Sequence, residues 1–117
     1  MTPALPQPDR TDKLAAAVAD LAWTWARREL GLAPDEPPFS QWETLPPERA
    51  RQVQLALLGA LEQMRAAVDD RACTAAYEAA AAGADYSDLG DAVGMTRQGA
   101  RRRWPGLAEI TKAARRT

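Results

Sequence analysis

Histidine is absent from this 117-residue sequence, and its absence bears first on chemistry. Histidine is the commonest general base near neutral pH and the commonest metal ligand. Cys73, the single cysteine, can neither close an internal disulfide nor build an ordinary zinc site. Gly90, Gly94 and Gly99 lack the lysine–hydroxyl pair of a phosphate-binding loop. We therefore expect no enzyme activity, no cofactor and no metal.

Long apolar runs are also missing. No stretch reaches the roughly 18 consecutive apolar residues of a membrane span, and the N-terminus lacks the basic and apolar segments of a secretory signal. A single cysteine suits a reducing compartment. We expect no membrane partner and a cytoplasmic location.

Alanine, in contrast, is abundant, at 26 of the 117 residues, and arginine supplies most of the positive charge. This bias is typical of high-GC coding sequences. Because alanine is the best helix former, it predicts an all-α fold, a small bundle of about five or six helices.

The charges are distributed unevenly. Residues 1–83 carry 12 acidic and 8 basic side chains, a net charge of −4, whereas residues 84–117 carry 4 acidic and 7 basic side chains, a net charge of +3. All seven of these bases lie at or after Arg97. An acidic body with a basic C-terminal end is typical of a nucleic-acid reader attached to an assembly module.

The chain divides into three predicted parts. Residues 1–10 hold three prolines and little apolar surface, so we expect a disordered lead, with a docking arm as the alternative. Residues 11–68 are expected to form a helical dimerisation part, and residues 69–117 a DNA-binding part. The predicted elements are helices at about 12–30, 48–68 and 70–82 and a proline-rich loop at 33–47. The last two of these helices are either separate or continuous.

Apolar stripes predict which helix faces are buried. In the first helix, capped by Thr11 and ended by Gly31, the stripe consists of Leu14, Val18, Leu21 and Trp25. Trp23 points to nearly the opposite side, where either the proline-rich loop or a second subunit covers it. In the later helices the inward residues are expected to be Val53, Leu57, Leu61, Met64 and Val68, and then Cys73, Ala76, Tyr77 and Ala80.

Residues 86–104, YSDLGDAVGMTRQGARRRW, predict two short helices joined by a tight turn. Ser87 is the expected N-cap of the first helix, in which Leu89 and Val93 share one face. Gly94 can adopt the left-handed conformation that turns the chain. Thr96 can cap the second helix, which stops before Pro105.

This pattern resembles the helix-turn-helix of DNA-binding regulators. The small Gly90 stands where the two helices touch, Met95 is at the corner, and Ala100 and Trp104 form the apolar side of the second helix. Gly99, a poor helix former, departs from the pattern. An ordinary helical hairpin with a solvated basic face is the alternative. Only 13 residues follow Trp104, so no two-stranded wing is expected.

The resemblance implies sequence-specific binding of double-stranded DNA by a transcriptional regulator. Arg97 and Arg101 are candidates for guanine contacts, and Gln98 for an adenine contact. The candidates for phosphate contacts are Arg102, Arg103 and the amides near Ser87 and Thr96. One such helix contacts few base pairs, so we expect a homodimer formed through helices 12–30 and 48–68.

Other functions stay open at this point. The same scaffold can serve as a protein-binding adaptor, or the protein can organise DNA in plasmid or phage maintenance. An effector pocket around Trp23, Trp25 and Trp42 is conceivable, although core packing explains these residues more simply.

Overall fold

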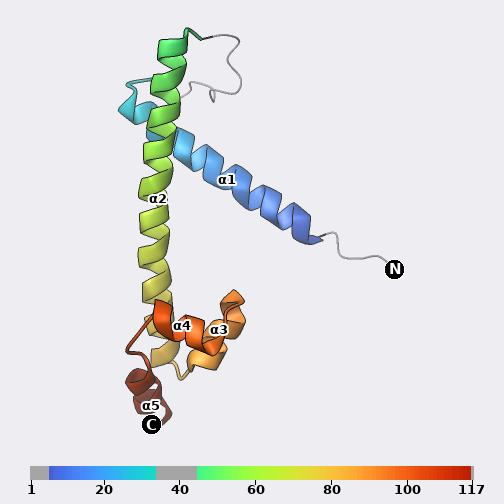
Figure 1. Cartoon of the computed structure of the whole chain (residues 1–117), viewed down its shortest axis with the longest axis vertical. Coiled ribbons are helices and arrows are strands. Elements are labelled where there is room, and N and C mark those ends of the chain that lie inside the picture. Colours follow the sequence, from blue (N-terminus) through green and yellow to red (C-terminus); the bar gives the residue numbers. More distant parts are fainter. Residues whose placement is uncertain (1–5, 34–44, 117) are drawn as a thin grey trace, which may run out of the picture. The chain divides into compact units, whose positions relative to one another are not determined.

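The computed structural model describes residues 6–33 and 45–116, and all regular structure in these two ranges is helical (Figure 1). The helices are α1 (Pro6–Glu29), α2 (Pro47–Ala81), α3 (Tyr86–Val93), α4 (Arg97–Arg103) and α5 (Ala108–Arg116). The predicted all-α class is confirmed. None of these helices combines the length and apolar character that a membrane crossing requires, within the residues described.

The bounds of the first two helices differ from the predicted ones. α1 begins at Pro6, so the described part of the lead at 1–10 is helical. Proline is tolerated there because the amides of a first turn have no partner within the helix. α2 is one helix of 35 residues, since the polar residues after Val68 interrupt its apolar stripe without breaking its backbone. Most of the proline-rich loop, with Trp42, lies outside the described residues.

The chain forms two compact units, Met1–Arg65 and Ala66–Thr117. The core of the first unit consists of Ala22, Trp23, Ala26, Val53 and Ala60. The small side chains of α1 and α2 in this list allow close packing of two helices around the Trp23 ring. Trp23 is therefore a core residue, 5% exposed.

The stripe Leu14, Val18, Leu21 and Trp25 is exposed, so the prediction that it faces the core is wrong. Periodicity identifies an apolar face but not what covers it. The α2 stripe is confirmed in part, because Val53 is buried and Leu57 and Met64 are half-buried, whereas Leu61 and Val68 are exposed.

In the second unit the core consists of Ala76, Ala80, Tyr86, Leu89, Ala100, Trp104 and Leu107. Two alanines of α2 thus face residues of α3 and α4, as the alanine spacing predicts. The predictions for two other residues are wrong, because Cys73 and Tyr77 are exposed. Val93 is also exposed, although the sequence places it on the same face of α3 as the buried Leu89. The α2 face that supports α3 and α4 is narrow and made of small side chains.

Candidate nucleic-acid interface

The N-cap of α3 is Asp85. The prediction that Ser87 has this role is wrong. The Asp85 carboxylate accepts from the Asp88 amide at 2.9 Å, and the Asp88 carboxylate accepts from the Asp85 amide at 2.9 Å. Two amides of the first turn are thereby satisfied reciprocally. Ser87 lies exposed inside α3. The two carboxylates place negative charge at this helix end, which disfavours the phosphate contact predicted near Ser87.

The turn between α3 and α4 is built on contact of Gly90 with the following backbone. A Cβ at Gly90 would lie 2.5 Å from the Met95 carbonyl oxygen and 3.2 Å from the Thr96 carbonyl. The Met95 amide donates to the Gly90 carbonyl at 2.8 Å, and Gly94 has φ 73°. Only glycine fits this approach at Gly90, and Gly94 adopts the left-handed conformation that the sequence predicts.

Thr96 caps α4, as predicted. Its hydroxyl accepts from the Gly99 amide at 2.9 Å. A Cβ at Gly99 would lie 3.2 Å from that same hydroxyl oxygen. Gly99 is a poor helix former, but a larger side chain at this position would crowd the Thr96 hydroxyl that caps α4.

The inner face of α4 is fixed by two core residues and one buried hydroxyl. Ala100 is fully buried and Trp104, one turn later, is 7% exposed. The Tyr86 hydroxyl donates to the Trp104 carbonyl at 2.6 Å and accepts from the Leu107 amide at 2.9 Å. The start of α3 thus holds the end of α4 and the chain that follows it.

The outer side of α4 carries the predicted readers. Arg97, Gln98, Arg101 and Arg102 are all exposed. The Arg101 guanidinium lies over the Tyr86 ring, 5.2 Å from its centroid, which restricts its orientation. Arg97 and Arg102 form no ion pair within the described ranges.

Arg103 differs from these neighbours. Its guanidinium pairs with the Asp69 carboxylate of α2 at 3.2 Å and lies over the Trp104 ring at 5.1 Å. The pair with Asp69 connects α4 to α2. Because its guanidinium already has these two partners, Arg103 is less available for a phosphate than the sequence predicts.

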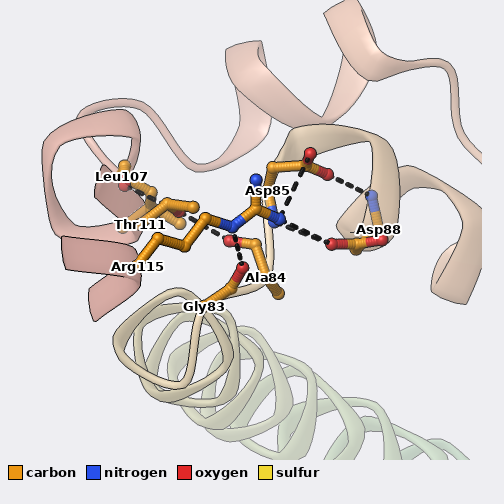
Figure 2. A network of polar contacts seen from close by, with 7 residues as sticks. All are labelled: Gly83, Ala84, Asp85, Asp88, Leu107, Thr111 and Arg115. Carbon is orange, nitrogen blue, oxygen red and sulfur yellow. Dashed lines mark hydrogen bonds and ion pairs between the residues drawn. The ribbon is translucent and has the colours of Figure 1, made fainter. Parts of the chain in front are cut away.

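A polar network joins α5 to the start of α3 (Figure 2). Arg115 donates through Nε to the Gly83 carbonyl at 2.8 Å and lies 3.5 Å from Asp85 and 3.7 Å from Asp88. The Thr111 hydroxyl donates to the Ala84 carbonyl at 2.6 Å. These contacts satisfy carbonyls after the end of α2 and fix the capping box.

The network also lowers the pKa of the Asp85 carboxyl. The Asp88 amide, which donates to Asp85, is the main reason why the pKa of Asp85 is lower than its ordinary value of 3.8. Desolvation, the second-largest effect, raises this pKa, and the Asp88 side chain, the charge of Arg115 and the Ser87 amide each lower it.

The sequence predicted the turn and both faces of α4 but missed several supporting residues. Asp85 was detectable, because Asp85 and Asp88 have the spacing of a capping box. The tertiary partners Tyr86, Asp69 and Arg115 have no local signal in the sequence. No group of three or more acidic or cysteine side chains that can hold a metal ion gathers in the part of the chain described.

Comparisons with models of protein families, with curated proteins and with solved structures found no match. A function must therefore be inferred from the residues of the chain itself.

Proposed function

We propose that the protein is a sequence-specific regulator that binds double-stranded DNA with α4 as its recognition helix. The observation that carries the proposal is the approach of Gly90 to Met95 and Thr96, which holds α3 and α4 in a compact corner, as a helix-turn-helix would require.

The charge of α4 supports the same function. Four of its seven residues are arginine and none is acidic. Its inner side is buried by Ala100 and Trp104, so the long donors are left on the other sides. Like charges on one solvated helix repel one another, whereas beside a phosphate backbone each one is attractive.

The outward residues differ in the role that we assign to them. Arg101 rests on the Tyr86 ring and is held for a bidentate contact with guanine, and Arg97 lies one turn before it on the same side. Gln98 is suited to adenine and Arg102 to a phosphate. Arg103 contributes mainly by fixing α4 against Asp69.

All-helical structure continues to the end of the described chain, with α5 where a winged domain has strands. We therefore propose a wingless motif. Lys112 on α5 pairs with its neighbour Glu109 at the surface and can add a phosphate contact without reading sequence.

Selection of bound duplexes from a random pool tests this proposal. On the selected duplex, Arg97→Ala and Arg101→Ala are each expected to cost about 1–3 kcal/mol and to relax the preference at one position. Lys112→Ala is the contrasting variant, expected to weaken binding to all sequences alike. If both arginine variants retain the wild-type preference, α4 is not the reading helix.

A further inference from the structure

The arginines of α4 differ in how the protein holds them. Arg97 and Arg102 have neither an ion pair nor a ring contact within the described ranges. Arg103 is held, but its Nη2 already donates to a carboxylate of α2 at 3.2 Å. The Cζ of Arg101 lies 5.2 Å from the centroid of the Tyr86 ring, and no ion pair engages this guanidinium in the same ranges. Arg101 therefore combines restricted motion with free donors.

The Tyr86 ring is a rigid support for that guanidinium. The side chain is 5% exposed and belongs to the core of the second unit. Its hydroxyl donates to the Trp104 carbonyl at 2.6 Å and accepts from the Leu107 amide at 2.9 Å. Its backbone begins α3, directly after the N-cap Asp85. Because both ends of the side chain are fixed, the ring cannot turn away from the guanidinium that lies over it.

We infer that Tyr86 makes the base pair read by Arg101 the most strictly specified position of the DNA site. The inference rests on the proposed function, in which Arg97 and Arg101 each contact a guanine. Tyr86 is a positioning residue in this account, because a buried ring acts on the DNA only through the arginine that it holds.

The first physical reason is conformational entropy. A mobile arginine side chain loses rotamer freedom when it binds, and this loss lowers affinity. Arg101 has given up part of that freedom in the free protein, because its positive charge is attracted to the face of the Tyr86 ring. The guanine contact of Arg101 is therefore expected to be stronger than that of Arg97, by about two- to tenfold in affinity.

The second reason is the response to a wrong base. A mobile arginine can turn to another acceptor, such as a phosphate, when its guanine is replaced. A guanidinium held on a ring cannot follow, so it loses the bidentate contact without recovering another. Discrimination at the position read by Arg101 should therefore exceed discrimination at the position read by Arg97.

Base substitutions in a selected duplex test the inference. Arg97→Ala and Arg101→Ala identify which guanine each residue reads. In the wild type, replacing the guanine of Arg101 is expected to weaken binding about two- to tenfold more than replacing the guanine of Arg97. Tyr86→Leu removes the ring and is expected to abolish this difference by reducing the loss at the Arg101 position alone. Equal losses at both positions in the wild type, or equal changes at both in Tyr86→Leu, overturn the inference.

Tyr86→Phe is the matched control, because it removes the hydroxyl and keeps the ring. It is expected to lower stability and yet to keep the difference between the two positions. A merely structural role of Tyr86 would instead change binding at both positions alike. Loss of the difference in Tyr86→Phe would show that the ring is not the support, and would also overturn the inference.

A measurement on the free wild-type protein keeps the inference testable if Tyr86→Leu does not fold. Nitrogen relaxation at the arginine Nε atoms reports how freely each guanidinium moves on the picosecond-to-nanosecond timescale. The order parameter of Arg101 is expected to exceed those of Arg97 and Arg102, and an equal value overturns the inference. A high order parameter at Arg101 in a protein that binds no duplex would count against the proposed function alone.

Discussion

The hydroxyl of Tyr86, the first residue of α3, donates to the carbonyl of Trp104, the residue that ends α4, at 2.6 Å. The same oxygen accepts from the Leu107 amide at 2.9 Å, and the Tyr86 ring lies beneath Arg101. One side chain thus joins the two ends of the motif and supports one of its proposed reading residues.

Tyr86→Phe tests how much of the stability of the second unit depends on that hydroxyl. The ring and its contact with Arg101 remain, but the Trp104 carbonyl and the Leu107 amide lose a buried partner. The expected loss of unfolding free energy is about 1–3 kcal/mol, measured by urea denaturation. Tyr77→Phe, at an exposed position of α2, is the control and should change it little.

Gly90→Ala tests the contact on which the corner depends. Its Cβ would lie 2.5 Å from the Met95 carbonyl oxygen, so α3 and α4 must separate or distort. We expect a loss of about 2 kcal/mol or more of stability, with faster amide exchange in both helices. Gly59→Ala is the matched control, because nothing lies within 4 Å of its Cβ, and it should stabilise α2 by about 0.5–1 kcal/mol. Equal effects of the two variants would contradict the geometry of the corner.

Asp85 predicts an acid dependence of stability. Its folded pKa is lowered, mainly by the Asp88 amide, so the carboxylate stabilises the folded state at every pH above its ordinary value of 3.8. This contribution is lost as the pH falls through the lowered folded pKa. The wild type should therefore exceed Asp85→Asn in unfolding free energy at neutral pH, and the difference should shrink in acid.

Thermal unfolding of both proteins at a series of pH values measures that difference. Asp91→Asn removes a carboxylate from the same helix without touching the capping box, and provides the comparison. A difference between wild type and Asp85→Asn that grows toward acid would contradict the assigned role of Asp85.

Local signals in the sequence predicted the turn between α3 and α4 well. A left-handed glycine at Gly94, a threonine cap at Thr96 and an alanine one turn into α4 each depend on neighbours within a few residues, and all three occur as predicted. Ser87 and Asp85 are both good caps by type, and only the reciprocal bond with Asp88 decides between them.

The sequence did not predict which face of α1 is buried or which distant residues form ion pairs. Trp23 and the Leu14–Trp25 stripe are apolar features on different sides of α1, and the sequence does not indicate which side packs against α2. The small residues Ala22 and Ala26 beside Trp23 decide it, because they allow the helices to approach. Arg103 and Asp69 are 34 residues apart, so no local pattern in the sequence predicts their ion pair.

The central claim, that the protein reads duplex DNA through α4, is tested most directly by fluorescence anisotropy of a labelled selected duplex and its scrambled counterpart at two salt concentrations. We predict tighter binding to the selected duplex and an affinity for both that falls steeply, by about tenfold or more, between about 50 and 200 mM salt. Absence of salt-dependent binding to any duplex by the wild-type protein would contradict the claim.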